Sequence, residues 1–149
     1  MSFKQKIYSC CLQLLDQKIQ DLQTALHDLT EGAENDSKSS AGDKHETARA
    51  MMQLEHEKIS RQLDDLHRQK NSLEQIAINT VSSKIINGSL IKTNNGYLFL
   101  SVAIGKINVD EIPVMVFSSQ SPMGIKMLGR KAGDSIEMNG TRYLIEDIK

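Results

Sequence analysis

The feature that most constrains this chain is a short polar segment, residues 35–42, between two stretches that share a heptad pattern. Before it, apolar residues are spaced three and four apart, at Leu12, Leu15, Ile19, Leu22, Leu26 and Leu29. After it, an apolar residue recurs every seven positions, at Met52, Ile59, Leu66 and Leu73. The residue numbers add to 78 in four pairs across the segment: 26 with 52, 19 with 59, 15 with 63, and 12 with 66. Two helices folded back on each other would bring these residues into shared layers.

We therefore predict an antiparallel coiled-coil hairpin over residues 1–79. Its helices are expected over about residues 3–34 and 44–77, each roughly 45 Å long at 1.5 Å per residue. A hairpin of this kind has a single apolar seam, and it carries its tip away from its base. The alternative is a structural coiled-coil arm that pairs with itself or with another helix.

The composition changes near residue 80, which suggests a second domain over residues 80–149. The first 79 residues have a net charge of −3 and no proline, whereas the remainder has a net charge of +2 and both prolines. The total of −1 leaves no large basic surface that would bind nucleic acid by charge alone.

The two cysteines, Cys10 and Cys11, are adjacent and match neither a disulfide framework nor a metal-ligand spacing. We expect reduced thiols in a reducing compartment. The chain has no apolar core of the signal-peptide type and no run long enough to span a membrane. A cytoplasmic protein without a membrane partner is therefore expected.

Residues 80–149 have the pattern of short strands joined by turns. Five strands are expected, over residues 85–93, 97–103, 112–117, 135–138 and 141–148, and Asn139-Gly140 is typical of a type I′ hairpin turn. Ser121-Pro122 should cap and open a short helix that Gly129 ends. The predicted fold class is α+β, with a small, mainly antiparallel sheet crossed by one short helix.

No constellation of residues indicates an enzyme. The C-terminal half contains no histidine, no glycine-rich phosphate loop and no nucleophile with a partner. Its few aromatic residues leave little for a deep apolar pocket, so peptidyl-prolyl isomerase activity is not expected. The four histidines lie in the hairpin without a common heptad face, and we do not expect a zinc site.

Two acids, Asp43 and Glu46, lie at the predicted tip. Their spacing is that of a capping box, in which both side chains would bond to backbone at the start of the second helix. The same spacing also presents two carboxylates one turn apart. Two carboxylates alone bind Mg²⁺ poorly, because the ion prefers six oxygen ligands. A second protein would have to supply the others.

Two segments of the chain resemble the Gre family of bacterial transcript-cleavage factors. Residues 121–134, Ser-Pro-Met-Gly-Ile-Lys-Met-Leu-Gly-Arg-Lys-Ala-Gly-Asp, resemble the C-terminal domain of that family, and Gly42–Ala48 are similar to its Gly-Asp-Leu-x-Glu-Asn-Ala tip. The order of the two parts also matches. The resemblance implies that residues 80–149 form an FKBP-like antiparallel domain.

What the resemblance implies about function is concrete. Gre-type factors bind RNA polymerase near its secondary channel and insert the coiled coil, so that the polymerase itself cuts backtracked RNA. Asp43 and Glu46 match the tip acids, which would share Mg²⁺ with the polymerase; no tightly bound cofactor is implied. The protein would be a monomer that meets the RNA 3′ end only through the polymerase. The implied polymerase contacts are Ser121, Pro122, Met123, Leu128 and Gly129.

Four positions near the tip depart from the family pattern: Lys44, Thr47, Arg49 and Ala50. Lys44 places a cation beside Asp43, where it would compete with a metal ion. These departures motivate a second hypothesis, a regulator that enters the channel without promoting cleavage.

Overall fold

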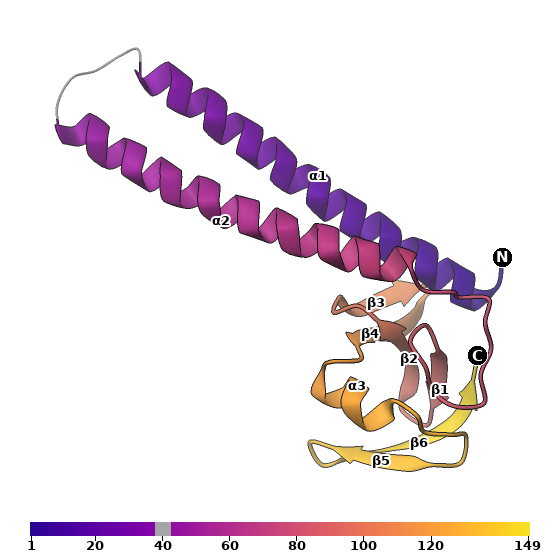
Figure 1. Ribbon diagram of the computed structural model, residues 1–149. Helices are drawn as coiled ribbons and strands as arrows, with labels where there is room; N and C mark the ends of the chain where they lie inside the picture. The colour runs from indigo at the N-terminus through magenta and orange to yellow at the C-terminus, as the bar shows by residue number, and fades with distance from the viewer. Residues whose placement is uncertain (38–42) are drawn as a thin grey trace. The chain divides into compact units, whose positions relative to one another are not determined.

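The computed structural model describes the backbone of residues 1–37 and 43–149 and the side chains of residues 1–32 and 46–149. It has the predicted α+β class, with two long helices ahead of a six-stranded mixed sheet and one short helix (Figure 1). In chain order the elements are α1 (Phe3–Ser37), α2 (Asp43–Glu74), β1 (Leu90–Thr93), β2 (Gly96–Ser101), β3 (Gly105–Val109), β4 (Ile112–Ser118), α3 (Pro122–Met127), β5 (Ser135–Met138) and β6 (Thr141–Ile148).

The chain divides into two compact units whose limits fall inside the long helices. One unit is residues 14–70, and the other combines residues 1–13 with residues 71–149. The second unit joins the first turns of α1 to the sheet, with contacts such as that of Phe3 with Tyr97. Neither long helix, in its described part, is apolar over the length that a bilayer crossing requires.

Within the unit of residues 14–70, α1 and α2 lie side by side and share an apolar cluster (Figure 1). Ile19, Ile59 and Leu63 are its buried members, and Leu22, Leu26, Leu29 and Leu66 are partly buried against them. The Lys70 ammonium also meets the Asp16 carboxylate at 2.7 Å. The prediction that the apolar positions of the two stretches pack together is confirmed for this cluster.

The helices end differently from the predicted bounds. Residues 35–37, expected to begin the turn, continue α1, and the rest of the predicted turn, residues 38–42, lies outside the described residues. At its other end α2 stops at Glu74, where the Ile76 amide bonds three residues back to the Leu73 carbonyl at 3.1 Å. The β-branched residues that follow, among them Ile78, have a low helix propensity.

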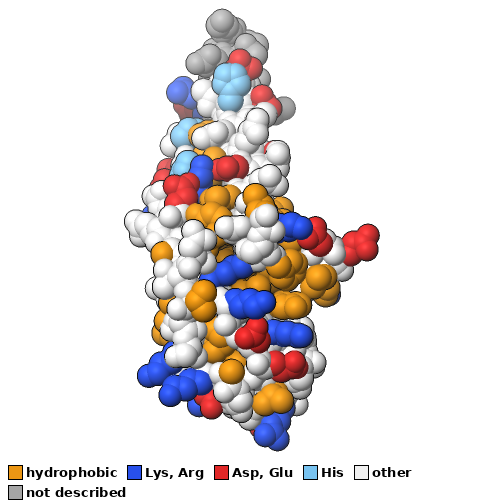
Figure 2. Space-filling view, turned by 90° about the vertical axis from the view of Figure 1, so that its right-hand side faces the viewer, with side chains coloured by type: hydrophobic (Ala, Val, Ile, Leu, Met, Phe, Trp, Pro, Cys, Tyr) orange, Lys and Arg blue, Asp and Glu red, His pale blue; other side chains and the backbone are white. Residues whose placement is uncertain are grey.

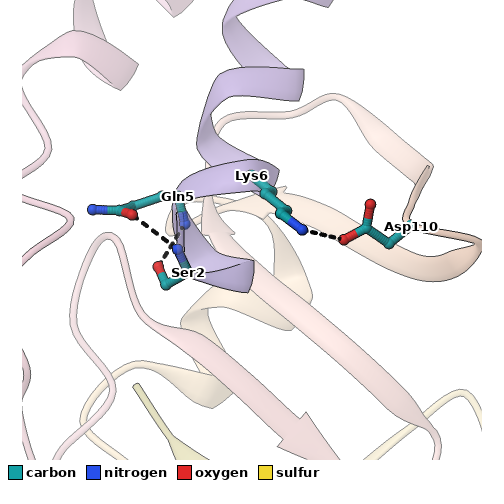
Figure 3. Close-up of polar contacts among 4 residues, drawn as sticks. All are labelled: Ser2, Gln5, Lys6 and Asp110. Atoms are coloured by element: carbon teal, nitrogen blue, oxygen red, sulfur yellow. Dashed lines mark hydrogen bonds and ion pairs between the residues drawn. The ribbon is translucent and has the colours of Figure 1, made fainter.

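A capping box begins α1. The Ser2 hydroxyl accepts from the Gln5 amide at 3.1 Å, and the Gln5 side-chain oxygen accepts from the Ser2 amide at 2.9 Å (Figure 3). One residue further, the Lys6 ammonium meets the Asp110 carboxylate at 2.9 Å. Phe3 packs edge-on against Tyr97, with ring centroids 5.2 Å apart. These contacts connect the start of α1 to the sheet.

The strand order of the sheet is β3-β4-β2-β1-β6-β5. Neighbours are antiparallel except β2 and β4, which are parallel. The sheet is therefore mainly antiparallel, as expected, and this one parallel pair makes it mixed. The cause is the crossover at residues 102–104, which carries the chain past the position of β4 so that β4 inserts between β2 and β3.

Strand β3 was not predicted, because its turn lacks the usual residues. A tight turn between β3 and β4 requires positive φ angles that Asn-Gly adopts easily, but here Asp110 and Glu111 adopt them, at 52° and 66°. By contrast, Asn139-Gly140 form the predicted turn, with φ of 51° and 79°, and the last two strands have the predicted bounds. The first strand is shorter than predicted and begins at Leu90.

Both faces of the sheet are buried at its centre. One face carries the cluster that includes α3: Ile85, Ile91, Leu98, Leu100, Phe117, Met127, Ile136 and Ile145. The other face carries Leu90, Phe99, Val114, Val116 and Ile107, which neighbour one another in the strand register. One cavity lies beside α3 and another lies beside the start of α1.

Candidate functional site

The predicted tip acids lie in the first turn of α2. Asp43 is the first residue of the helix, and its side chain lies outside the described residues. Glu46 is exposed and follows three residues later, which places the two positions on the same side of one turn. From Glu46 to Lys70, within one compact unit, the helix extends for roughly 36 Å. The structure thus places both backbone positions together and shows the Glu46 side chain exposed.

Among the described side chains, no complete metal site accompanies Glu46. Across the side chains of residues 1–32 and 46–149, no group of three or more His, Cys, Asp or Glu residues is placed to hold a metal ion. His27 instead pairs with Glu31 on the next turn of α1, at 3.1 Å. An exposed carboxylate at the start of a helix has two chemical uses: it interacts favourably with the helix N-terminus, or it contributes oxygen ligands to a site that another molecule completes.

The second predicted site is the segment around α3, which the structure builds tightly against the end of β4. The Ser121 hydroxyl caps the helix by accepting from the Gly124 amide at 3.0 Å, and it donates to the Ser118 carbonyl at 2.7 Å. Gly124 lies so close to the end of β4 that an added β-carbon would clash with the Ser118 backbone oxygen. Gly129, with φ of +84°, follows the end of the helix as predicted.

The outer side of α3 is apolar and exposed. Met127 is fully buried beneath the helix, whereas Ile125 and Leu128 are 67% and 49% exposed. Among the predicted contact residues, Pro122, Leu128 and Gly129 are exposed, while Ser121 and Met123 are half-buried. Sequence reasoning missed Ile125, an exposed residue between the buried Gly124 and Met127, while Leu128 follows the last residue of the helix as its C-cap.

A cavity of about 650 Å³ lies beside α3. Its lining is mostly apolar and includes Leu98, Met115, Phe117, Met123 and Tyr143. The sequence did not indicate a hollow of this size, because its aromatic residues are few. Three of them, Tyr97, Phe117 and Tyr143, nevertheless line it, since the strand register brings β2 next to β4 and the β5–β6 hairpin packs into the same core.

Cys11 is not placed as a nucleophile. Cys11 is completely buried, and burial together with the neighbouring Cys10 raises the pKa of its thiol to about 12. A thiol with that pKa is protonated at neutral pH, and the thiolate is the nucleophilic form. Cys11 is therefore a core residue of α1.

The structure identifies only the fold class of the protein, which is α+β, with two long helices before a six-stranded mixed sheet. No family model matches the chain, and no curated protein matches it. Its function must therefore be argued from its own residues.

Proposed function

We propose that this protein is a Gre-like transcription factor of bacterial RNA polymerase. In this proposal α1 and α2 form a coiled-coil hairpin that enters the secondary channel, and the C-terminal sheet is an FKBP-like domain that binds the polymerase through the α3 segment. Asp43 and Glu46 promote cleavage of backtracked RNA by the polymerase, with a Mg²⁺ ion that both proteins hold. The factor acts as a cytoplasmic monomer and is not itself an enzyme.

The observation that carries the proposal is the exposed Glu46 carboxylate in the first turn of a long helix. Ile19, Ile59 and Leu63 hold α2 against α1 along part of its length. A paired helix can deliver a terminal carboxylate into a narrow space that a globular domain cannot enter. Two carboxylates supply only part of the coordination shell of Mg²⁺, and a site shared with a second protein supplies the remainder.

The exposed side of α3 supports a protein partner. Apolar residues at the centre of an interface contribute most of its binding energy when a partner covers them. Ile125 and Leu128 are such residues, presented on a helix that Ser121 and Gly124 hold rigidly to the sheet. The rigid base means that little ordering entropy is lost on binding.

The test is RNA cleavage in backtracked elongation complexes of purified bacterial polymerase. The wild-type protein should release short 3′ RNA fragments in the presence of Mg²⁺. Asp43→Asn and Glu46→Gln should each abolish release and leave polymerase binding intact. Glu57→Gln is the matched control, because Glu57 is an exposed acid on the same helix, and it should retain full release. Ile125→Asp should reduce binding and cleavage together.

A non-cleaving channel regulator is the second candidate. Arg49 is exposed and lies three residues after Glu46, on the same side of α2. A cation there would oppose a bound metal ion. Polymerase binding without RNA release, together with competition against a cleaving factor, would establish this function and reject the first.

The third candidate is a structural coiled-coil module, for which we expect neither RNA release nor polymerase binding. It would be recognised by self-association in light scattering and by the absence of polymerase binding.

A further inference from the structure

A cavity of about 650 Å³ lies beside the start of α1, within the unit that contains the sheet. It differs from the cavity next to α3, with which it has one lining residue, Tyr97, in common, and Leu90 and Lys92 line it from the sheet face that carries Phe99. Its lining comes from the first residues of α1, the segment 78–81, and strands β1, β2, β4 and β6 with Lys149. Its lining contains no residue of α2 and none of the α3 segment.

The strand register sets a row of polar side chains along one side of this cavity. Lys92 lies opposite Tyr97 in the β1–β2 ladder and opposite Asp147 in the β1–β6 ladder, so all three share one face. In the next row, Leu90 and Lys149 exchange two backbone hydrogen bonds of 2.8 Å each. Two lysines from neighbouring strands are therefore brought to the same cavity.

Lys4 adds a third lysine from α1. Its residue is only 8% exposed, and burial lowers the pKa of its ammonium. The ammonium donates to the Thr80 carbonyl oxygen over 3.4 Å, which is a long contact for a hydrogen bond. An ammonium has three N–H donors. Burying such a group is costly unless it is well paired, and an anion in the cavity would supply the stronger partner.

The lining combines this charge with apolar surface. The side chains of three lysines and one aspartate give a formal excess of two positive charges, while Phe3, Leu90, Ile112 and Val81 are apolar. On the face drawn in Figure 2, Lys and Arg side chains lie among hydrophobic ones. The volume is in the range of sites that bind small organic molecules. An inorganic ion would use the charge and leave the apolar walls without a contact.

We propose that this cavity binds a small organic anion, with a carboxylate or phosphate group on an apolar body. Lys4 and Lys92 bind the anionic group, and Phe3 and Ile112 contact the body. Lysine binds carboxylate and phosphate as a point charge, so the charge pattern suits both groups. This site is independent of the proposed action on polymerase.

The test is a titration of the full chain with phenyl phosphate and with benzoate, followed by ¹H–¹⁵N NMR. Both anions should shift the backbone amides of Lys4, Lys92 and Lys149, and the tighter of the two identifies the preferred group. Benzyl alcohol, which has the ring without the charge, should bind at least tenfold more weakly. Equal binding of benzyl alcohol and the anions, or shifts confined to the α3 cavity, would overturn the proposal.

Variants distinguish binding of the anion in this cavity from its nonspecific attraction to any surface lysine. Lys92→Met, on a strand surface, should weaken the binding of phenyl phosphate at least tenfold. Lys4→Met should do the same, provided that circular dichroism shows an unchanged fold. Lys84→Met is the matched control, since Lys84 is exposed and outside the lining, and its affinity should stay within twofold of wild type. Equal effects of Lys92→Met and Lys84→Met would refute the assignment.

Discussion

The turn between β3 and β4 stores backbone strain at a position where one substitution should relieve it. Asp110 and Glu111 are consecutive non-glycine residues with φ of 52° and 66°. Aspartate tolerates this conformation, and its carboxylate also binds Lys6. Glutamate has no such local compensation. Glu111→Gly is therefore the informative change, and it would give the turn the Asp-Gly pair that hairpins prefer.

The expected gain in the free energy of unfolding is the difference between two effects. Holding a residue with a β-carbon in the left-handed region costs about 1–2 kcal/mol. Glycine removes that cost and increases the entropy of the unfolded chain, which offsets roughly 0.5–1 kcal/mol. The free energy of unfolding should thus rise by about 0.5–1 kcal/mol, which for a chain of this size corresponds to an increase in Tm of about 1–4 °C.

Urea denaturation followed by circular dichroism measures this change. Glu111→Ala is the control: it removes the carboxylate but keeps the β-carbon, and its stability should stay within about 0.5 kcal/mol of wild type. Amide hydrogen exchange in β3, at Ile107 and Val109, should slow only in Glu111→Gly. If the glycine variant is no more stable than the alanine variant, then the turn is not strained and the argument fails.

Three buried residues, Ser101, Leu63 and Cys11, lead to four further predictions. Ser101 lies in the core with its hydroxyl oxygen lacking a partner among the described residues, so Ser101→Ala should raise the free energy of unfolding by about 1 kcal/mol; a loss of stability in calorimetry would contradict this. Leu63→Ala should cost roughly 2–4 kcal/mol in urea denaturation because Leu63 belongs to the α1–α2 cluster, whereas Leu54→Ala, at a position 65% exposed, should have little effect; similar losses would refute the cluster. Because the pKa of Cys11 is raised by burial to about 12, iodoacetamide at pH 8 should label Cys10 much faster, as mass spectrometry would show. The unfolded chain releases the Cys11 proton near pH 9 and the folded chain does not, so this group should lower stability as pH rises above 9; equal labelling rates would show that Cys11 is accessible.

Local patterns were sufficient where the physical cause is local. The spacing of Ile19, Ile59 and Leu63 predicted their packing, because helical periodicity places them on one side of each helix. Ser121-Pro122 and Asn139-Gly140 predicted a helix start and a hairpin turn, because each needs particular φ angles or a capping hydroxyl. For the candidate site, the sequence predicted the exposure of Glu46, and three of the five residues that it named around α3, Pro122, Leu128 and Gly129, are exposed.

Non-local pairing was not accessible in this way. The heptad pattern could not indicate that residues 1–13 pack with the sheet, since that depends on contacts such as Phe3 with Tyr97. Strand β3 was missed because Asp110 and Glu111 turn the chain without a turn sequence, at a cost that the packed strands outweigh.

The amino-acid sequence alone determined two helices with a common apolar seam and the α+β class of the chain. It also placed two acids in the first turn of α2. All of these follow from periodicity and capping. Only the tertiary structure decided that β4 inserts beside β2 and that Lys4, Lys92 and Lys149 line one cavity. The physical reason is that strand register brings distant residues together, and register is set by the packing of the whole sheet.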